Sequence, residues 1–479
     1  MKKVGNIVYI GICLILCVLP FAGMTVYRTD ITTENKTLAA FPNWKKDGKL
    51  NQKYFSDLSA YLEDHFAFRQ ELVSADAIIQ SKVFGVSNVD TIMVGTDGWL
   101  FYTDTVDDYL KQNTMTERQV FNTVHNLSLL QQYVTGQGAE ILFTVAPNKN
   151  SLYDYNMPYY TNYKSNSKKN MDMLKPKLKE AGIFYVDLFE AFEKEQEILY
   201  LKRDSHWNNK GAVLAYNTIL DNLMITHETY ETVKTIREKK EYGDLNKMLY
   251  PLNAKPEWNY YYRYDSHWSY VSKEQNVEAA WIETECPKGE GTLLMFRDSF
   301  GNTLLPLLAE QFSNASFSKA VPYRIAEYME KCRPNLVLVE KVERNLDEYM
   351  QSPPVMPGPE VRLNLIEEND RKEDITLVMS EAIEDTDYWT FSGELKQNNI
   401  EADAKIYVRL NDGEKSKTYE AFTTSTEESD YGYLLYLSKN ELQSLGFLSD
   451  RKITIDIITG EGNYYKLLNT KEIFLKENQ

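Results

Sequence analysis

The sequence is poor in cysteine and in basic residues, and each shortage excludes a class of function. Its 479 residues include four cysteines and no CxxC pair, so a zinc site built from thiolates is excluded. Lys and Arg number 53 against 70 Asp and Glu, and the formal net charge of −17 excludes a protein that binds the nucleic-acid backbone. Hydrophobic residues make up 43% of the chain, an ordinary globular content, so extensive disorder is not expected.

Long uncharged runs are also scarce, and the longest one lies at the N-terminus. Residues 4–27 carry no charge and follow Lys2 and Lys3. As a helix rising about 1.5 Å per residue, this run spans about 36 Å, enough to cross a bilayer core. We therefore expect residues 1–28 to anchor the chain in the membrane with its body outside the cytoplasm, since positive charge stays on the cytoplasmic side. A cleaved signal peptide is the alternative, and it also exports the body.

Of the four cysteines, Cys13 and Cys17 lie in the N-terminal run and Cys286 and Cys332 lie in the body of the chain. Export places the body in an oxidising compartment. Cys286 and Cys332 are then candidates for one disulfide, because such bonds persist outside the cytoplasm. The sequence does not fix the distance between the two residues, so two buried free thiols are the alternative.

Between residues 76 and 347, helical patterns alternate with short apolar runs. Phe121 to Tyr133 and Lys210 to Leu223 have the spacing of amphipathic helices. Short apolar runs separated by such helices indicate βαβ units and a parallel sheet. The expected strands cover residues 141–146, 183–186, 293–296 and 336–339.

The pattern changes after a proline-rich segment. Four of the 15 prolines fall between Ser352 and Pro359, which predicts an extended, stiff linker. Beyond it only strand-like runs follow, separated by turn residues, as in a β-sandwich whose aromatic side chains either bind sugar or fill strand positions. We expect a membrane anchor at 1–28, a catalytic domain with a helical stalk at 29–351, a linker at 352–360 and a β-sandwich at 361–479.

One serine lies at the position where parallel sheets usually bind their ligands. Ser299 follows the expected strand 293–296 and precedes an expected helix at 301–312. Ligands of open α/β sheets bind at the carboxyl ends of the strands, and a backbone N–H at a helix N-terminus stabilises an oxyanion. A serine nucleophile also needs a base. The alternative is that Ser299 only caps the helix.

A base and its orienting acid are offered by Asp204-Ser205-His206-Trp207. Asp204 and His206 are two residues apart, which puts both side chains on one side of an extended segment, so Asp204 can orient the imidazole toward Ser299. The alternative is a surface Asp–His pair. The same string recurs at 265–268, in a Tyr- and Trp-rich stretch that we interpret as a loop lining the cleft. We prefer the first copy because the helix expected at 210–223 follows it.

The string Asp204-Ser205-His206-Trp207 resembles the DxHW signature of DHHW-type proteins, which are similar to the alginate O-acetyltransferases and their SGNH-hydrolase-like domains. The spacing of acid and base is that of the alginate relatives, while Arg297 before Asp298 departs from the general SGNH pattern. The other strings that carry the resemblance are Glu34-Asn35-Lys36, Phe41-Pro42, Asp64-His65-Phe66, Gly95 to Tyr102, Ala146-Pro147-Asn148-Lys149 and Arg297 to Gly301.

The resemblance implies an SGNH-hydrolase-like fold with helices flanking a parallel sheet. It implies that Ser299 is the nucleophile, His206 the base and Asp204 the orienting acid of an O-acetyltransferase. Such enzymes move acetyl groups to or from hydroxyls of an exported polysaccharide, and a membrane-bound O-acyltransferase partner usually delivers the acetyl group. We expect no cofactor and no metal. The further oxyanion or substrate contacts expected are Asn148, Lys149, Arg297, Trp207, His267 and Trp268.

Two other functions use the same sequence features. A polysaccharide acetylesterase has the same three residues with water as the acceptor, and a catalytically weak scaffold of an export complex only binds the glycan.

The 34 tyrosines gather at residues 153–163 and 260–270, which predicts a cleft where sugars stack. Glu340 and Glu343 follow the last expected strand of the sheet and are either cleft residues or the solvated start of a helix.

Overall fold

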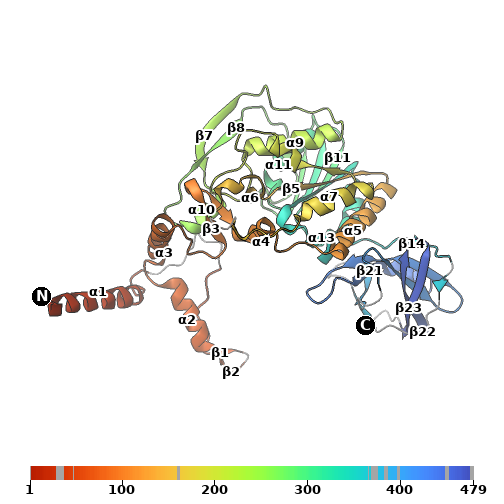
Figure 1. Ribbon diagram of the computed structural model, residues 1–479, viewed down its shortest axis with the longest axis horizontal. Coiled ribbons are helices and arrows are strands. Elements are labelled where there is room, and N and C mark those ends of the chain that lie inside the picture. Colours follow the sequence, from red (N-terminus) through yellow and green to blue (C-terminus); the bar gives the residue numbers. More distant parts are fainter. Residues whose placement is uncertain are drawn as a thin grey trace.

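A computed structural model gives the fold of the chain (Figure 1). The Glu34-Asn35-Lys36 string and part of the tyrosine cluster at 153–163 lie outside the residues that the structure describes. The described residues are 2–27, 37–46, 48–158, 162–364, 366–367, 376–381, 387–395, 400–447 and 452–474.

A seven-stranded sheet forms the centre of the larger part of the molecule. Its order is β6 (Tyr185–Val186), β5 (Glu140–Ala146), β13 (Leu336–Val342), β11 (Thr292–Phe296), β12 (Asn314–Ser318), β10 (Trp281–Glu285) and β9 (Ser269–Tyr270). The strands from β6 to β12 run parallel, and β10 and β9 continue the sheet antiparallel. The parallel sheet predicted from the apolar runs is therefore present.

Helices cover both faces of this sheet, which explains why its central strands are apolar on both sides. Side chains alternate along β11, so that Leu293 and Met295 pack with two helices and Leu294 and Phe296 pack with three others. The first face holds α9 (Asn209–Asn222) and α11 (Gly301–Gln311). The second holds α5 (Glu117–Gly136), α7 (Asn170–Glu180) and α12 (Ile325–Cys332).

Smaller elements surround the sheet, and among the described residues they form three two-stranded antiparallel sheets, β1–β2, β3–β4 and β7–β8. The last two are formed by β3 (Ile92–Val94), β4 (Leu100–Tyr102), β7 (Thr235–Glu241) and β8 (Glu257–Tyr262). The other elements are α1 (Lys2–Gly23), β1 (Lys45–Lys46), β2 (Lys49–Leu50), α2 (Tyr54–His65), α3 (Arg69–Ile79), α4 (Val106–Leu110), α6 (Lys149–Leu152), α8 (Leu188–Glu193), α10 (Asp244–Leu249) and α13 (Glu348–Gln351).

The membrane-spanning helix predicted at the N-terminus is not supported. Within the described part of the chain, no helix combines the length and the apolarity that crossing a membrane requires. The uncharged run does form α1, but this helix ends at Gly23 and includes Asn6 and Pro20.

The C-terminal part consists of two sheets around one core. One sheet has the order β14-β19-β18-β22-β23-β15 and the other β16-β17-β21-β20. Side chains from both sheets share one apolar cluster, as in a β-sandwich. The elements are β14 (Glu360–Val361), β15 (Ile366–Glu367), β16 (Val378–Glu381), β17 (Tyr388–Glu394), β18 (Lys405–Asn411), β19 (Ser416–Glu420), β20 (Phe422–Thr424), β21 (Gly432–Ser438), α14 (Lys439–Ser444), β22 (Lys452–Glu461) and β23 (Tyr464–Phe474).

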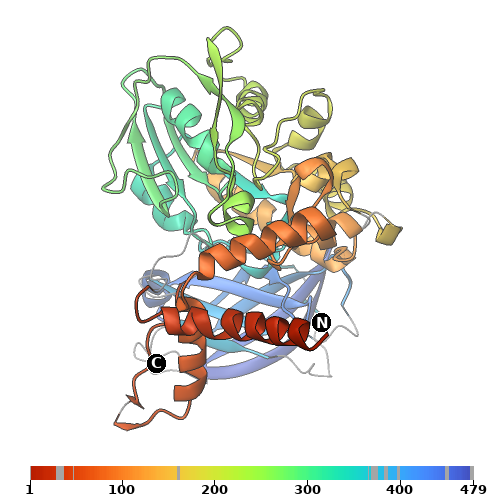
Figure 2. The same ribbon diagram turned by 90° about the vertical axis from the view of Figure 1, so that its left-hand side faces the viewer.

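The two parts are packed against each other through α5. Asn126 donates from Nδ2 to the Thr423 carbonyl at 2.9 Å, and its Oδ1 accepts from the Thr423 N–H at 3.1 Å. His125 Nε2 lies 3.2 Å from the Ala421 carbonyl. The proline-rich segment is also packed, because Val355 and Met356 are buried in the same cluster as α5. Figure 2 shows the C-terminal strands lying directly beneath the α/β part.

The two cysteines considered for a disulfide are free. Cys286 is buried and Cys332 is half-buried. The Cys332 thiol lies 3.4 Å from Ser316 Oγ, to which it donates a hydrogen bond. The alternative of two free thiols is the one that the structure shows.

Candidate active site

Ser299 occupies a turn that its neighbours hold firmly. The Asp298 carboxylate accepts from the Phe300 N–H at 2.8 Å and from the Val342 N–H at 2.7 Å, which ties the turn to the end of β13. Gly301 opens α11, and a Cβ there would lie 2.7 Å from the Cβ of Arg297. The carboxyl end of β11 therefore presents Ser299 at a fixed place.

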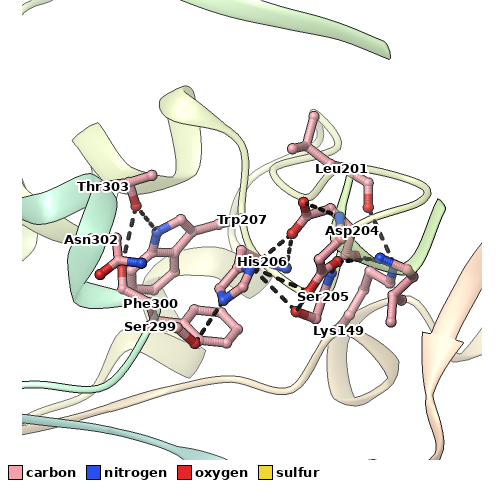
Figure 3. A network of polar contacts seen from close by, with 12 residues as sticks. Lys149, Leu201, Asp204, Ser205, His206, Trp207, Ser299, Phe300, Asn302 and Thr303 are labelled. Atoms are coloured by element: carbon pink, nitrogen blue, oxygen red, sulfur yellow. Dashed lines mark hydrogen bonds and ion pairs between the residues drawn. The ribbon is translucent and has the colours of Figure 1, made fainter. Parts of the chain in front are cut away.

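The structure brings Ser299, His206 and Asp204 into one hydrogen-bonded chain (Figure 3). Ser299 Oγ lies 2.8 Å from His206 Nε2, and His206 Nδ1 lies 2.7 Å from Asp204 Oδ1. The His206 side chain is 23% exposed, so a substrate can reach the pair. With Nδ1–H donated to the carboxylate, Nε2 is left to accept the serine proton, which is the arrangement of a Ser-His-Asp triad.

Charges around the imidazole favour its protonated form. Burial opposes the charge on His206, but the hydrogen bond from His206 to Asp204 and the negative charges of Asp204 and Asp244 raise its pKa above 6.5. Burial likewise opposes the charge on Asp204, and the hydrogen bond and charge of His206 hold the pKa of that carboxyl at about 2. Asp204 is thus ionised and stabilises the imidazolium that forms when the base takes a proton.

Asp244, at the start of α10, is a second acid that the sequence analysis missed. Its Oδ2 lies 3.8 Å from His206 Nδ1 and accepts from the Ser205 hydroxyl, and its backbone N–H donates to Asp204 Oδ2 at 3.0 Å. Burial raises the pKa of Asp244. The one sequence signal for this residue is an acidic residue opening a helix, and that signal says nothing about proximity to His206.

Asp204, His206 and Asp244 are also the residues that come nearest to a metal site within the described ranges. One ligand atom from each lies within 4.8 Å of the other two. The His206 nitrogen that faces the two acids already donates to Asp204. A cation there would have to displace this hydrogen bond, so the donor set suits a triad better than a metal.

Lys149 supports the triad and does not face a substrate. Its Nζ donates to the carbonyls of Leu201, Lys202 and Asp204 at 3.2, 3.1 and 2.6 Å. The side chain is buried, and burial lowers its pKa to about 8. The expected substrate contact is therefore corrected: Lys149 holds the loop that carries Asp204.

Asn148 and Arg297 are likewise scaffold residues. The Asn148 amide, expected to contribute to an oxyanion hole, is fully buried and donates to Asp108 Oδ2 at 3.0 Å. Arg297 is buried and donates to the carbonyls of Val277 and Ala279 at 2.8 and 3.3 Å. Both side chains are occupied in the interior, and the expected substrate contacts are corrected accordingly.

Trp207 packs behind the triad instead of lining it. It is 1% exposed, its Nε1–H donates to Thr303 Oγ1, and its ring lies 4.9 Å from the ring of Phe300, edge to face. The expected substrate contact at Trp207 is therefore also corrected. This hydrogen bond links the segment that carries His206, just before α9, to α11, the helix that follows Ser299.

The second copy of the string lies elsewhere. His267 Nδ1 is 2.6 Å from Glu310 Oε1 and its Nε2 is 2.7 Å from Lys288 Nζ. The ring of Trp268 packs against Tyr270 at 4.9 Å. The structure thus brings His206, and not His267, to Ser299.

Arg344 is another site residue that the sequence did not indicate. It follows β13, and its guanidinium carbon lies 5.3 Å from the ring centre of Tyr102 and 5.8 Å from that of Phe300. The side chain is half-exposed, and its charge lowers the pKa of His206. A cation therefore lies near enough to this site for its charge to act on His206.

Glu340 and Glu343, whose roles the sequence left open, are both interior residues. Glu340 is fully buried and its Oε2 accepts from the Asp298 N–H at 3.2 Å. Burial raises the pKa of Glu340 well above 4.5, and it raises that of Glu343 to about 7. Neither belongs to a solvated helix start.

Part of the chain is similar to known proteins. Residues 92–259 match the family model described as SGNH hydrolase-like domain, acetyltransferase AlgX. This range includes Asp204 and His206 and ends before Ser299. The probable alginate O-acetylase AlgJ of Pseudomonas syringae pv. tomato is 25% identical over 190 residues, which are 37% of this chain and 46% of AlgJ. The chain thus spans about half the length of this curated relative.

Solved structures with a likeness to the chain include PatB1 of Bacillus cereus, with a TM-score of 0.44 and 19% identity over 54% of this chain and 98% of PatB1. A DHHW family protein from Eubacterium siraeum has a TM-score of 0.38 and 16% identity over 47% of this chain and 85% of its own. AlgX of Pseudomonas aeruginosa has a TM-score of 0.37 and 16% identity, over 74% and 90% of the two chains. Over residues 92–259 the chain is therefore similar to the SGNH hydrolase-like domain of the acetyltransferase AlgX.

Proposed function

We propose that this chain is an O-acetyltransferase that acts on hydroxyls of a polysaccharide outside the cytoplasm. The observation that carries the proposal is the hydrogen-bonded chain from Ser299 through His206 to Asp204. The AlgX-type domain and the likeness to an alginate O-acetylase support acetyl transfer as the reaction.

In the first step Ser299 takes the acetyl group. Its Oγ attacks the acetyl carbonyl carbon while the hydroxyl proton passes to His206 Nε2. The bond from the acetyl carbon to the donor oxygen then breaks, and the imidazolium returns the proton to that oxygen. The product is an acetyl-serine, and Asp204 stabilises the charge on His206 throughout.

In the second step a sugar hydroxyl takes the place of the donor. Its oxygen attacks the acetyl-serine carbonyl and its proton passes to His206, after which the bond from Ser299 Oγ to the acetyl carbon breaks. Ser299 then recovers its proton from the imidazolium. With water as the acceptor, the same steps release acetate and describe an esterase.

Each step creates a negative oxygen that needs hydrogen-bond donors. The backbone N–H of Ser299 stands at the N-terminal end of α11, where the helix dipole adds positive potential. We assign the second donor to Arg344, because the Asn148 amide is already bound to Asp108.

The acetyl donor and the location of the reaction belong to the same proposal. We propose that a membrane-bound O-acyltransferase supplies the acetyl group, since the chain would otherwise need its own source outside the cytoplasm. Export is supported by Lys2 and Lys3 preceding the largely apolar α1.

The test is the Ser299→Ala variant of the whole chain, with Ser59→Ala at an exposed serine as the matched control. The wild type and the control should hydrolyse a chromogenic acetyl ester, and in the presence of glycan oligomers they should yield acetylated oligomers by mass spectrometry. Ser299→Ala should lose both activities. Retention of both in Ser299→Ala would overturn the proposal, and free acetate without acetylated oligomers would identify an esterase.

A further inference from the structure

Two carboxyl groups meet at the turn that carries Ser299, and the reaction steps above use neither of them. Asp298 directly precedes the nucleophile, and each oxygen of its carboxylate accepts a backbone N–H. Glu340 lies on β13 and is fully buried. Acidic side chains are almost never fully buried unless they are paired, so the burial of Glu340 needs a physical cause.

The Glu340 carboxyl contacts the turn on both sides of Ser299. Its Oε2 accepts from the Asp298 N–H at 3.2 Å, and a Cβ at Gly301 would lie 3.2 Å from the same oxygen. The carboxyl group therefore lies against the two residues that flank the nucleophile most closely in the structure, and a displacement of this group would displace the turn.

The other oxygen of Glu340 indicates that the group is protonated. Oε1 is buried and has no hydrogen-bond partner among the described residues. Burying a carboxylate with one oxygen unsatisfied costs free energy, and protonation removes that cost. The protonated group needs an acceptor in place of a second donor. The Asp298 carboxylate lies within hydrogen-bond reach, and each of its oxygens has a second lone pair.

The neighbouring charges also favour a neutral Glu340. Burial and the negative charge of Asp298 raise the pKa of Glu340 well above 4.5, although the charge of Lys341 lowers it. Lys341 is itself paired with Glu348, and Arg297 donates to backbone carbonyls and a side-chain amide, so neither of these two described cations forms an ion pair with Glu340. The charged and titratable groups around Glu340 are Asp298, Arg297, Lys341, Tyr200, Tyr323 and Tyr349.

We propose that Glu340 is a positioning residue that keeps its proton in the active enzyme and donates a hydrogen bond to the Asp298 carboxylate. This acid pair then joins β13 to the turn, because Asp298 also accepts from the Val342 N–H. A hydrogen bond from a neutral donor to an ionised acceptor is stronger than one between neutral groups, which suits a turn that must hold Ser299 in place. The proposal rests on the proposed function, in which the same serine is the nucleophile.

The experiment compares Glu340→Gln with Glu340→Met, and Glu193→Gln, at an exposed glutamate of α8, is the control. Glutamine supplies an acceptor for the Asp298 N–H and a donor for the Asp298 carboxylate, whereas methionine supplies no donor and only a weak acceptor. With an acetyl ester as substrate, Glu340→Met should lower kcat about 10²-fold at unchanged KM, because the nucleophile is misplaced while the ester still binds. Glu340→Gln should restore kcat to within about threefold of the wild type.

Infrared spectroscopy tests the proton on Glu340 independently of activity. At neutral pH the wild type should show the C=O stretch of a protonated carboxyl that Glu340→Gln lacks and Glu193→Gln keeps. The difference between the wild type and Glu340→Gln separates this band from that of Glu343, whose pKa burial raises to about 7. The measurement also applies if Glu340→Met does not fold.

Three results would overturn the proposal. Equal losses of kcat in Glu340→Gln and Glu340→Met would show that a neutral hydrogen-bonding group is not enough at this position. An unchanged kcat in Glu340→Met would show that the carboxyl does not position the turn, and a difference spectrum confined to the carboxylate bands would show that Glu340 is ionised. The proposed function fails on another result, ester hydrolysis that persists in Ser299→Ala, and the infrared assignment does not depend on that result.

Discussion

At the scale of single residues, Asp244 adds to the effect of Asp204 in raising the pKa of His206, and so affects the pH at which the base becomes available. His206 must be neutral to accept the serine proton, so activity rises as pH increases through its raised pKa. Asp244→Asn removes a negative charge that favours the imidazolium, and the pKa of His206 should fall. We expect the acid limb of the pH–rate profile to move to lower pH. The profile of Asp265→Asn, in the second copy of the string, should stay in place, and an unmoved profile in Asp244→Asn would contradict the assigned role.

Arg344 should shift the same profile in the opposite direction. Its positive charge lowers the pKa of His206, so Arg344→Met should move the acid limb to higher pH. As an oxyanion donor it should also contribute to kcat, which we expect to fall by about 10²–10³-fold with little change in KM. Steady-state kinetics on an acetyl ester measure both effects, with Arg237→Met as the control. A rise in KM at constant kcat would assign Arg344 to substrate binding instead.

The sequence allowed Ser299, His206 and Asp204 to be predicted as neighbours because their residue types and spacing carry chemical meaning. Asp204 and His206 sit two residues apart, and Ser299 follows an apolar strand. Asp244 and Arg344 reach the site only through tertiary contacts, which no local pattern records. Lys149 is near the site in the fold, but its side chain points at backbone carbonyls, and chain position does not give side-chain direction.

At the scale of elements, the start of α11 depends on the absence of a side chain at Gly301. A Cβ there would lie 2.7 Å from Arg297 Cβ and 3.2 Å from Glu340 Oε2, so Gly301→Ala must displace the turn that carries Ser299. We expect a loss of about 1–3 kcal/mol in stability and a fall in kcat of about 10²-fold.

The matched control is Gly136→Ala in α5, where a Cβ meets nothing within 4 Å. This variant should keep full activity and normal thermal unfolding. Equal activity losses in the two glycine variants would show that the effect of Gly301→Ala is not local to the turn.

The elements that could be predicted are those whose own residues are apolar enough to indicate burial. β5, β11 and β13 each contain the largely apolar run that predicted a strand there. β12 reads Asn-Ala-Ser-Phe-Ser, and it is buried because it lies between β11 and β10. The Tyr- and Trp-rich stretch expected as a loop begins within β8, whose pairing with the polar β7 is a long-range contact.

At the scale of the whole molecule, His125 links stability to pH at the contact between the two parts. It is buried against Glu420 and the Ala421 carbonyl, and burial lowers its pKa to about 4. In the unfolded chain His titrates near 6.5, so below that pH the unfolded state binds a proton that the folded state does not. Stability should therefore fall by about 3 kcal/mol as pH decreases from about 6.5 to 4.

Denaturant unfolding of the whole chain at several pH values measures this loss. His125→Gln keeps a polar side chain without the titration and should have a shallower dependence on pH, whereas His227→Gln should keep the dependence of the wild type. Parallel curves for His125→Gln and the wild type would contradict the assignment.

The sequence could not reveal this coupling, because the proline-rich segment suggested a spacer between independent parts and His125 is almost 300 residues away from its partners.

The polar contact face of α5 has a consequence for biosynthesis. Arg118 and Asn126 bind carbonyls that lie 286 and 297 residues further along the chain. At about 5–20 residues per second, roughly 15–60 s pass between the synthesis of this helix and the arrival of its partners. An apolar face exposed for so long would promote aggregation. The contact face of α5 instead carries Arg, Asn and His side chains, which are well hydrated. The nascent α/β part can therefore fold first and wait in solution for the C-terminal strands to dock.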